Sequence, residues 1–238
     1  MAVPAWELFV ALVTVIAIAV VGLARASASH LRMDDPLARP SGQPLPASGP
    51  GLLLNLSLTH LGVGAAVGSV VWLTGVPLEA LGLVDLPDPV SVLLLSLALL
   101  VVNEGLSLGV QAFGVDEPEL LRELLAPETL REWAILLGAL LPAIAVAEEL
   151  LFRGALIGGV AAATTISPWV LAAISSIGFG AAHTAQGDLG IVVAALLGFT
   201  LAAAFVVTGN LLLVVIAHYL VNATEFVLHE GLDVEWGR

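Results

Sequence analysis

Residues 141–156 read LPAIAVAEELLFRGAL and combine charged residues with a long apolar run. It places two adjacent carboxylates, Glu148 and Glu149, and the guanidinium of Arg153 inside a run that is otherwise apolar enough to cross a lipid bilayer. An ionisable side chain near the bilayer centre costs roughly 2.5–3.5 kcal/mol on insertion scales, so such residues normally face the protein interior and serve a function. The stretch therefore predicts a membrane-spanning helix that carries a polar site.

The three charged residues of this stretch are not equivalent. Glu149 and Arg153 are four residues apart and are expected to pair along one helical face. The helical repeat turns Glu148 by about 100° from its neighbour, so the same arginine cannot serve it well. We therefore expect Glu148 to have a partner elsewhere in the chain.

The composition of the whole chain is that of a polytopic membrane protein. Of its 238 residues, 59% are hydrophobic and 11% are charged, whereas about a quarter of the residues of a soluble domain are charged. The mean hydropathy is +1.04. We expect a single membrane-embedded domain over residues 1–238, folded as an all-α transmembrane bundle of about seven spans (six to eight), with the motif-bearing core at about 132–229.

The charges are strongly unbalanced, because twenty acidic residues stand against seven basic ones, all of which are arginine. A surface so negative argues against nucleic acid as a partner and suggests, as a hypothesis, a cytoplasm of high salt concentration. The chain has no cysteine. Disulfides and thiolate chemistry are therefore excluded, and a zinc site would have to use His, Glu, Asp or Asn.

Seven apolar stretches are predicted to span the membrane: residues 8–24, 51–76, 90–113, 132–160, 168–183, 189–207 and 211–228. We expect an extended loop rich in arginine and proline at 25–50, a short acidic loop at 77–89 and an amphipathic interfacial helix at 116–131. The sixth and seventh spans are joined by a tight turn, Thr208-Gly209-Asn210. Polar residues interrupt the second, third and seventh spans: Asn55, Thr59 and His60, then Asn103 and Glu104, and finally Glu225 and His229 on the face of His218.

The fourth stretch is longer than the bilayer core is thick, so we expect it to tilt or to bend at Gly154, Gly158 or Gly159. Arginine placement predicts the orientation. With the 25–50 loop in the cytoplasm, every arginine except Arg153 is cytoplasmic. The prediction is a multi-pass protein of the cell membrane with its N-terminus outside and its C-terminus in the cytoplasm.

Two further polar pairs have the four-residue spacing of one helical face. Phe179 and His183 lie near the end of the fifth predicted span, and His218 and Asn222 lie in the body of the seventh. A single histidine at a helix end is commonly an interfacial or capping residue, and a single asparagine in a span commonly joins two helices. Two histidines, a carboxamide and the unpaired Glu148 in separate spans instead favour a functional site.

These groups support a limited chemistry. A carboxylate and an imidazole in a desolvated pocket can polarise a water molecule and direct it at a carbonyl carbon. A second histidine and an amide can donate to the oxyanion that forms. Peptide hydrolysis fits this set, and coordination of zinc is the alternative use of the same groups.

The motifs resemble those of the CPBP family of intramembrane proteases, which includes the type II CAAX prenyl endopeptidases. The resemblance covers residues 134–223 and rests on three motifs in order: Glu148-Glu149-x3-Arg153, Phe179-x3-His183 and His218-x3-Asn222. It implies an endopeptidase that cleaves near the C-terminus of membrane-anchored, prenylated CAAX-type substrates. The implied partners are membrane lipid and such a peptide, and no oligomeric state is implied.

The resemblance also implies a role for each matching residue. Glu148 would act with His183 on the attacking water, and His218 and Asn222 would stabilise the oxyanion. The remaining motif residues would support them: Glu149, Arg153 and Phe179. The metalloprotease pattern H-E-x-x-H is absent, so we favour a glutamate-dependent hydrolysis without a metal cofactor; a zinc ion would use Glu148, His183 and His218.

Two other functions remain open at this point. Intramembrane Glu and His residues also relay protons in proton- or ion-coupled transporters. The chain could also be a non-catalytic membrane scaffold or immunity protein that keeps the fold without turnover. The depth of the polar residues in their spans predicts, for the protease, a site that opens to the cytoplasm.

Overall fold

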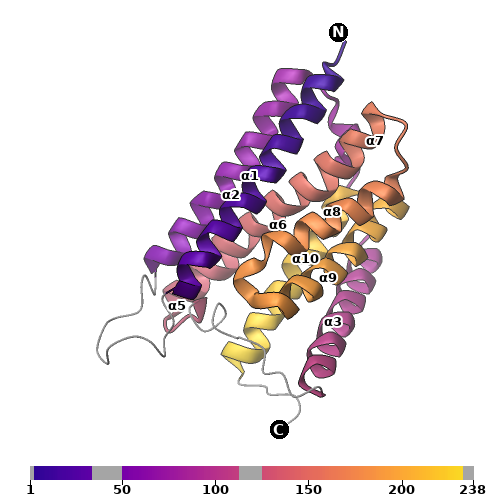
Figure 1. Cartoon of the computed structure of the whole chain (residues 1–238). Helices are drawn as coiled ribbons and strands as arrows, with labels where there is room; N and C mark the ends of the chain where they lie inside the picture. The colour runs from indigo at the N-terminus through magenta and orange to yellow at the C-terminus, as the bar shows by residue number, and fades with distance from the viewer. Residues whose placement is uncertain (1–2, 34–49, 113–124, 233–238) are drawn as a thin grey trace.

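The computed structural model describes residues 3–33, 50–112 and 125–232, which form a bundle of helices (Figure 1). The long helices are α1 (Trp6–Met33), α2 (Pro50–Thr74), α3 (Pro89–Ala112), α9 (Gly187–Thr208) and α10 (Leu211–Phe226), and α8 (Pro168–Ala182) is shorter. The central span, Leu130–Ala163, consists of α5 (Leu130–Ile135), η2 (Leu136–Leu140), α6 (Leu141–Glu149), η3 (Leu150–Gly159) and α7 (Val160–Ala163). Two 3₁₀ turns, η1 (Leu78–Leu81) and η4 (Thr184–Gln186), and the π-helical η5 (Val227–Gly231) complete the described elements.

The structure confirms an all-α membrane bundle of about seven spans. Six helices of the described residues are long and apolar enough to cross a bilayer, and α8 is an additional apolar helix of 15 residues. At 1.5 Å per residue α8 is about 22 Å long, which is less than the roughly 30 Å of the hydrocarbon core. One end of α8 can therefore lie within the depth of the membrane.

The outer faces of the bundle are apolar. Trp72, Val101, Ile177 and Val207 are each at least 70% exposed, although they belong to four different helices. A surface of this kind is stable against lipid, because lipid tails are as apolar as these side chains. The structure is thus that of a multi-pass membrane protein.

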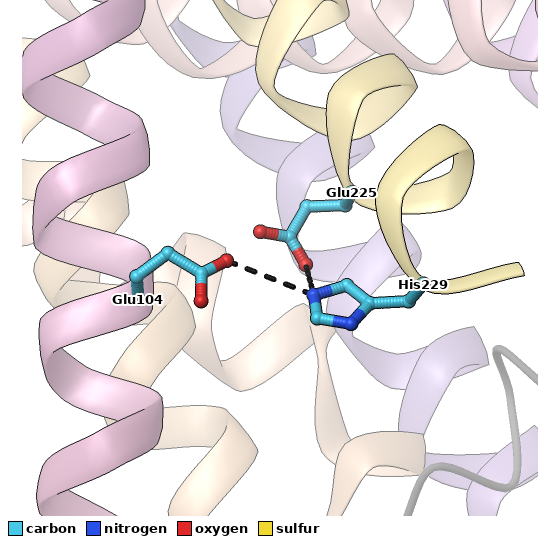
Figure 2. Close-up of side chains that lie close together, drawn as sticks. All are labelled: Glu104, Glu225 and His229. Carbon is cyan, nitrogen blue, oxygen red and sulfur yellow. Dashed lines mark ion pairs between the residues drawn. The ribbon is translucent and has the colours of Figure 1, made fainter. Parts of the chain in front are cut away.

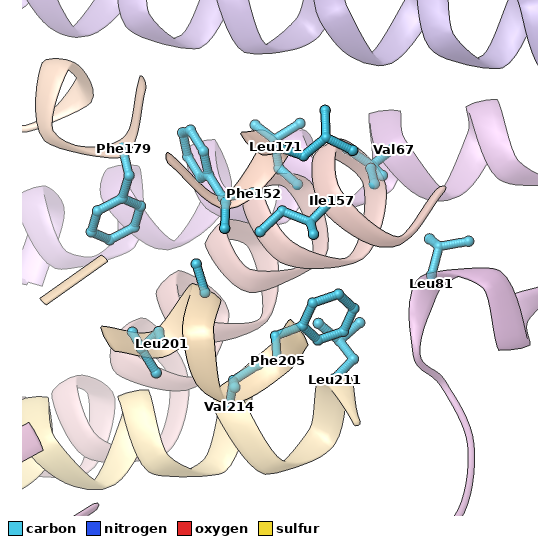
Figure 3. Close-up of a cluster of buried hydrophobic side chains, with 14 of the residues drawn as sticks. Val67, Leu81, Phe152, Ile157, Leu171, Phe179, Leu201, Phe205, Leu211 and Val214 are labelled. Carbon is cyan, nitrogen blue, oxygen red and sulfur yellow. The ribbon is translucent and has the colours of Figure 1, made fainter. Parts of the chain in front are cut away.

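The central span lies in the middle of the bundle, where it packs against α1, α2, α8 and α10. Half of its most apolar window is buried, compared with 6–33% for the other spans. Its first turn is fixed by a capping box, in which Thr129 accepts a hydrogen bond from the Glu132 amide and the Glu132 carboxylate accepts one from the Thr129 amide. Its buried side chains form the main core with those of the surrounding helices (Figure 3).

The position of the capping box differs from the interfacial helix that we expected at 116–131. Residues 113–124 lie outside the described part of the chain, but residues 126–129 are not helical and a new helix begins at Leu130. Because the cap ends one element and starts another, Arg131 belongs to the central span. The expectation of a single amphipathic helix to residue 131 was wrong.

The central span is interrupted by π-helical turns in place of a glycine kink. These turns are η2 and η3, and η3 contains all three glycines at which we expected a bend. Two of these glycines permit close packing: a Cβ atom at Gly158 would lie 2.5 Å from the Ala80 carbonyl oxygen, and one at Gly159 would lie 2.5 Å from the Phe9 ring. π-Helical turns of this type occur frequently at functional sites.

The first helix is longer than predicted, and the loop expected at 25–50 is therefore partly wrong. Residues 25–33 continue α1, whereas 34–49 lie outside the described residues. The apolar run ends at Ala24, but helix propensity continues, because alanine, leucine and arginine are good helix formers and no proline occurs between Ala24 and Pro36. The predicted turn after α9 is confirmed: Gly209 has φ 63°, and Asn210 caps α10 through the Leu213 amide.

Candidate active site

The buried ion pair of the first motif is present as predicted. Arg153 donates from Nη1 to Glu149 Oε1 at 2.8 Å, and both side chains are fully buried. The second guanidinium nitrogen donates to the Gly198 carbonyl of α9 at 2.7 Å. The guanidinium carbon also lies 4.5 Å from the centroid of the Phe179 ring. This arrangement ties the central span to α8 and α9.

Glu149 also holds one of the two candidate catalytic histidines. Its Oε1 atom lies 2.7 Å from Nδ1 of His218 on α10. A carboxylate accepts, so the His218 Nδ1 hydrogen donates in this contact, and the other ring nitrogen is left for a different partner. That nitrogen, Nε2, lies 3.8 Å from Oε2 of Glu148.

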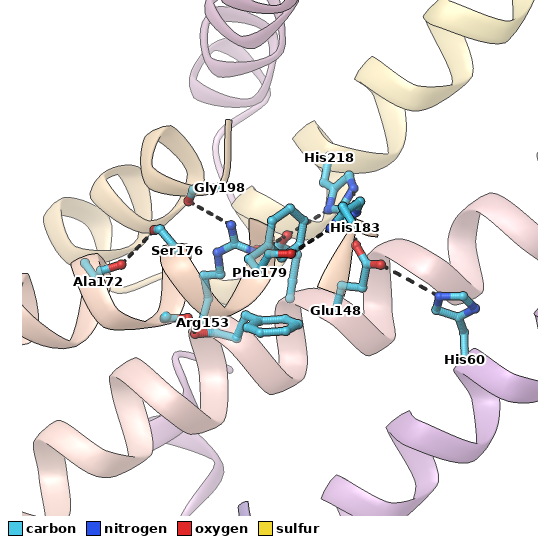
Figure 4. Close-up of polar contacts among 12 residues, drawn as sticks. His60, Glu148, Arg153, Ala172, Ser176, Phe179, His183, Gly198 and His218 are labelled. Atoms are coloured by element: carbon cyan, nitrogen blue, oxygen red, sulfur yellow. Dashed lines mark hydrogen bonds and ion pairs between the residues drawn. The ribbon is translucent and has the colours of Figure 1, made fainter. Parts of the chain in front are cut away.

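Glu148 faces imidazoles from three different helices (Figure 4). Nε2 of His60 on α2 is 3.7 Å from its Oε1 atom, and Nε2 of His218 is 3.8 Å from its Oε2 atom. His183 is close enough to interact with it electrostatically. Glu148 Oε2 is buried and accepts no hydrogen bond from the described protein atoms, so it can still accept one from a substrate or a water molecule.

His183 is placed at this site by the end of α8. It is the C-cap residue, with φ −98° and ψ 26°, and its Nδ1 atom lies 2.7 Å from the Phe179 carbonyl oxygen. A carbonyl only accepts, so Nδ1 donates and a neutral His183 has an unprotonated Nε2. The His183 ring also packs on the Phe179 ring with centroids 4.5 Å apart. Phe179 therefore supports both His183 and Arg153.

Asn222 is the least constrained of the four candidates. It follows His218 by one helical turn on α10 and is half-buried, but none of the hydrogen bonds among the described residues involves its side chain. Glu225 and His229, which continue the same face in sequence, lie instead with Glu104 of α3. The structure thus brings Glu148, His183 and His218 together, with Asn222 one turn away on the same helix.

His60 is the residue at this site that sequence reasoning missed. All three motifs lie in the C-terminal half of the chain, yet α2 brings an imidazole from the N-terminal half to Glu148. His60 is held by a hydrogen bond from Nδ1 to the Leu56 carbonyl at 2.8 Å. The signal in the sequence was an ionisable residue within an apolar span.

The geometry also bears on the zinc alternative. Among the described residues, three ligand atoms lie within 4.8 Å of one another in a single group, Glu104, Glu225 and His229. The donor atoms of Glu148, His183 and His218 do not meet this condition.

The comparison with known proteins agrees with the motifs. Residues 130–224 match the family model described as "Type II CAAX prenyl endopeptidase Rce1-like". No curated protein matches the chain, and no solved structure matches it. The matched segment begins at the capped start of the central span and ends just after Asn222, so it contains every residue of the three motifs. Residues 130–224 of this membrane protein are therefore similar to the Rce1-like type II CAAX prenyl endopeptidase family, in agreement with the resemblance of the three motifs.

Proposed function

We propose that the protein is an endopeptidase that hydrolyses a peptide bond near the C-terminus of a membrane-anchored substrate of the prenylated CAAX type. The observation that carries the proposal is the position of Glu148, a carboxylate within the membrane depth that faces imidazoles from three helices. Glu149, by comparison, accepts close hydrogen bonds on Oε1 from Arg153 at 2.8 Å and from His218 at 2.7 Å. Glu148 has partners at 3.7 and 3.8 Å, which leaves room for a reactant between them.

Glu148 and His183 activate the attacking water in this proposal. The water donates one hydrogen to the Glu148 carboxylate and the other to Nε2 of His183, which is unprotonated in the neutral ring because Nδ1 donates to Phe179. Glu148 takes up the proton as the water oxygen bonds to the carbonyl carbon. The same proton then passes to the leaving nitrogen as the C–N bond breaks, giving a carboxylic acid and an amine. The second hydrogen of the water, which faces His183 Nε2, then leaves the acid through this imidazole, so the acid ends as a carboxylate.

His218 and Asn222 stabilise the oxyanion of the tetrahedral intermediate. Glu149 holds Nδ1 of His218, so Nε2 is the nitrogen that faces Glu148 and the reacting carbonyl, and it donates when it carries a hydrogen. The Asn222 amide lies one turn further along the same face of α10. Its lack of a side-chain partner among the described residues leaves both of its N–H groups available to substrate.

His60 acts on Glu148 from the opposite side. Because its Nδ1 hydrogen is committed to the Leu56 carbonyl, Nε2 meets the Glu148 carboxylate favourably only if a proton lies on one of the two groups. His60 is therefore a positioning residue that shares a proton with the catalytic carboxylate. No metal is required by this scheme.

The substrate enters from the cytoplasmic side in this proposal. His183 lies at the end of α8 and His60 lies in the first half of α2, so both belong to the same side of the bundle if successive spans alternate in direction. The placement of the arginines assigns that side to the cytoplasm, with the N-terminus outside and the C-terminus inside. The apolar outer faces allow a prenyl group to lie in lipid while the peptide reaches Glu148.

The test is cleavage of a panel of lipid-anchored peptides by the purified full-length protein in proteoliposomes. Peptides with a farnesylated C-terminal CAAX sequence are compared with unprenylated peptides, and Glu148→Gln is compared with Glu79→Gln, which removes an exposed carboxylate in the loop after α2. We expect Glu148→Gln to lose about 10²–10⁴-fold in kcat and Glu79→Gln to lose none. Activity should persist in the presence of a chelator.

Three outcomes would contradict the proposal. Full activity of Glu148→Gln would remove the catalytic role of this carboxylate. Loss with chelator and recovery with zinc would replace the glutamate mechanism by a metal mechanism. If no peptide is cleaved but proton-coupled solute uptake depends on Glu148, the protein is a transporter.

A further inference from the structure

A second group of ionisable side chains lies between α3 and the C-terminal end of α10, away from Glu148 (Figure 2). Nε2 of His229 is 3.7 Å from Oε1 of Glu104 and 3.7 Å from Oε2 of Glu225. The three side chains are mostly buried: 15% of the His229 side chain is exposed, 22% of Glu104 and 20% of Glu225. Glu104 comes from one span, and Glu225 and His229 come from another.

The spacing of these atoms suits a metal ion better than a direct hydrogen bond. A distance of 3.7 Å exceeds the usual N–H···O range of about 2.7–3.2 Å. Ligands that bind zinc at about 2.0–2.2 Å in a tetrahedron are roughly 3.3–3.6 Å from one another. One ligand atom from each residue lies within 4.8 Å of the other two, so small side-chain movements would close the site.

Asn103 orients one of the ligands. Its side-chain amide donates to Oε1 of Glu225 at 2.5 Å, and the other oxygen of that carboxylate is the one nearest His229. Hydrogen bonds of this type from a neighbouring residue fix ligand orientation in metal sites. The group thus has three ligands and a residue that orients one of them.

We propose that Glu104, Glu225 and His229 bind a divalent transition-metal ion of the zinc class, with the fourth position open to water or solvent. Mixed imidazole and carboxylate ligands suit such ions. The site has a structural role: it fastens α3 to α10. α3 already packs against α10 along its length, so a metal ion there adds a polar link to an existing helix contact.

The experiment measures zinc binding by the purified, metal-depleted full-length protein in detergent. Titration in competition with a chromophoric chelator gives the stoichiometry and affinity, and cobalt in place of zinc gives the visible absorption of a tetrahedral site. We expect one equivalent of zinc and a melting temperature that rises on its addition. Glu104→Gln and His229→Gln should each weaken binding at least tenfold and remove the temperature rise, and Asn103→Ala should weaken it about 10–100-fold.

His183→Gln is the matched control, because it removes an imidazole from the active site and leaves this group intact. Binding retained in His183→Gln and lost in His229→Gln supports the proposal. The opposite pattern would place the metal at the active site, and the absence of saturable binding by the unmodified protein would show that the group is only a polar contact between helices. If either Glu104→Gln or His229→Gln folds poorly, zinc binding by the other variant still tests the site, because each substitution removes one proposed ligand.

Discussion

Replacing Arg153 by alanine should destabilise the protein more than any substitution of an exposed residue. Arg153 makes hydrogen bonds of 2.8 Å to Glu149 and 2.7 Å to the Gly198 carbonyl, and neither charged side chain has any exposed surface. Removing one partner of a buried ion pair costs about 3–5 kcal/mol, because the other charge remains buried. Glu149 keeps its bond to His218, so we expect the lower part of this range, about 3 kcal/mol.

The free energy of unfolding can be measured by titrating the purified protein in mixed micelles with SDS and following tryptophan fluorescence. Arg131→Ala is the matched control, because it removes an exposed arginine from the same span and should change stability by less than about 0.5 kcal/mol. The double variant Glu149→Gln/Arg153→Met should recover about 1–2 kcal/mol relative to Arg153→Ala, since no buried charge is left unpaired. An Arg153→Ala variant within about 0.5 kcal/mol of the unmodified protein would refute this reasoning.

Two further predictions concern helix packing and the proposed reaction. Gly180→Ala should destabilise the protein by about 1–3 kcal/mol in the same SDS titration, because its Cβ atom would lie 2.6 Å from the Ile191 carbonyl oxygen of α9. Gly68→Ala is the control and should be neutral, because its Cβ atom would meet nothing within 4 Å. Equal effects of the two substitutions would contradict the assigned packing. His60→Gln should lower kcat about tenfold or more with little change in KM, because His60 lies beside Glu148; a rise in KM alone would show that it contacts substrate instead.

The local features of the active site could be predicted from the sequence because they depend on spacing within one helix. Residues four apart share a face, so the pairing of Glu149 with Arg153 followed directly from their positions, as did the need of Glu148 for another partner. The membrane class followed from composition, since so few charges are incompatible with a soluble surface. Two predicted helix boundaries were wrong, because hydrophobicity alone does not set where a helix begins or ends. Helix propensity continues α1 beyond Ala24, and the Thr129 cap starts a new helix at Leu130.

Contacts between helices distant in sequence were decided only by the tertiary structure. The motifs indicated that Glu148, His183 and His218 belong together, but the arrival of His60 from α2 depends on how that helix packs against the central span. Likewise, Glu225 and His229 continue the face of His218 in sequence, yet they meet Glu104 because α3 crosses α10 near its C-terminal end. The sequence thus determined which side chains share one helix face, because that follows from the 3.6-residue repeat. Which faces meet was decided by the packing of the whole bundle, since apolar side chains favour burial without specifying a partner.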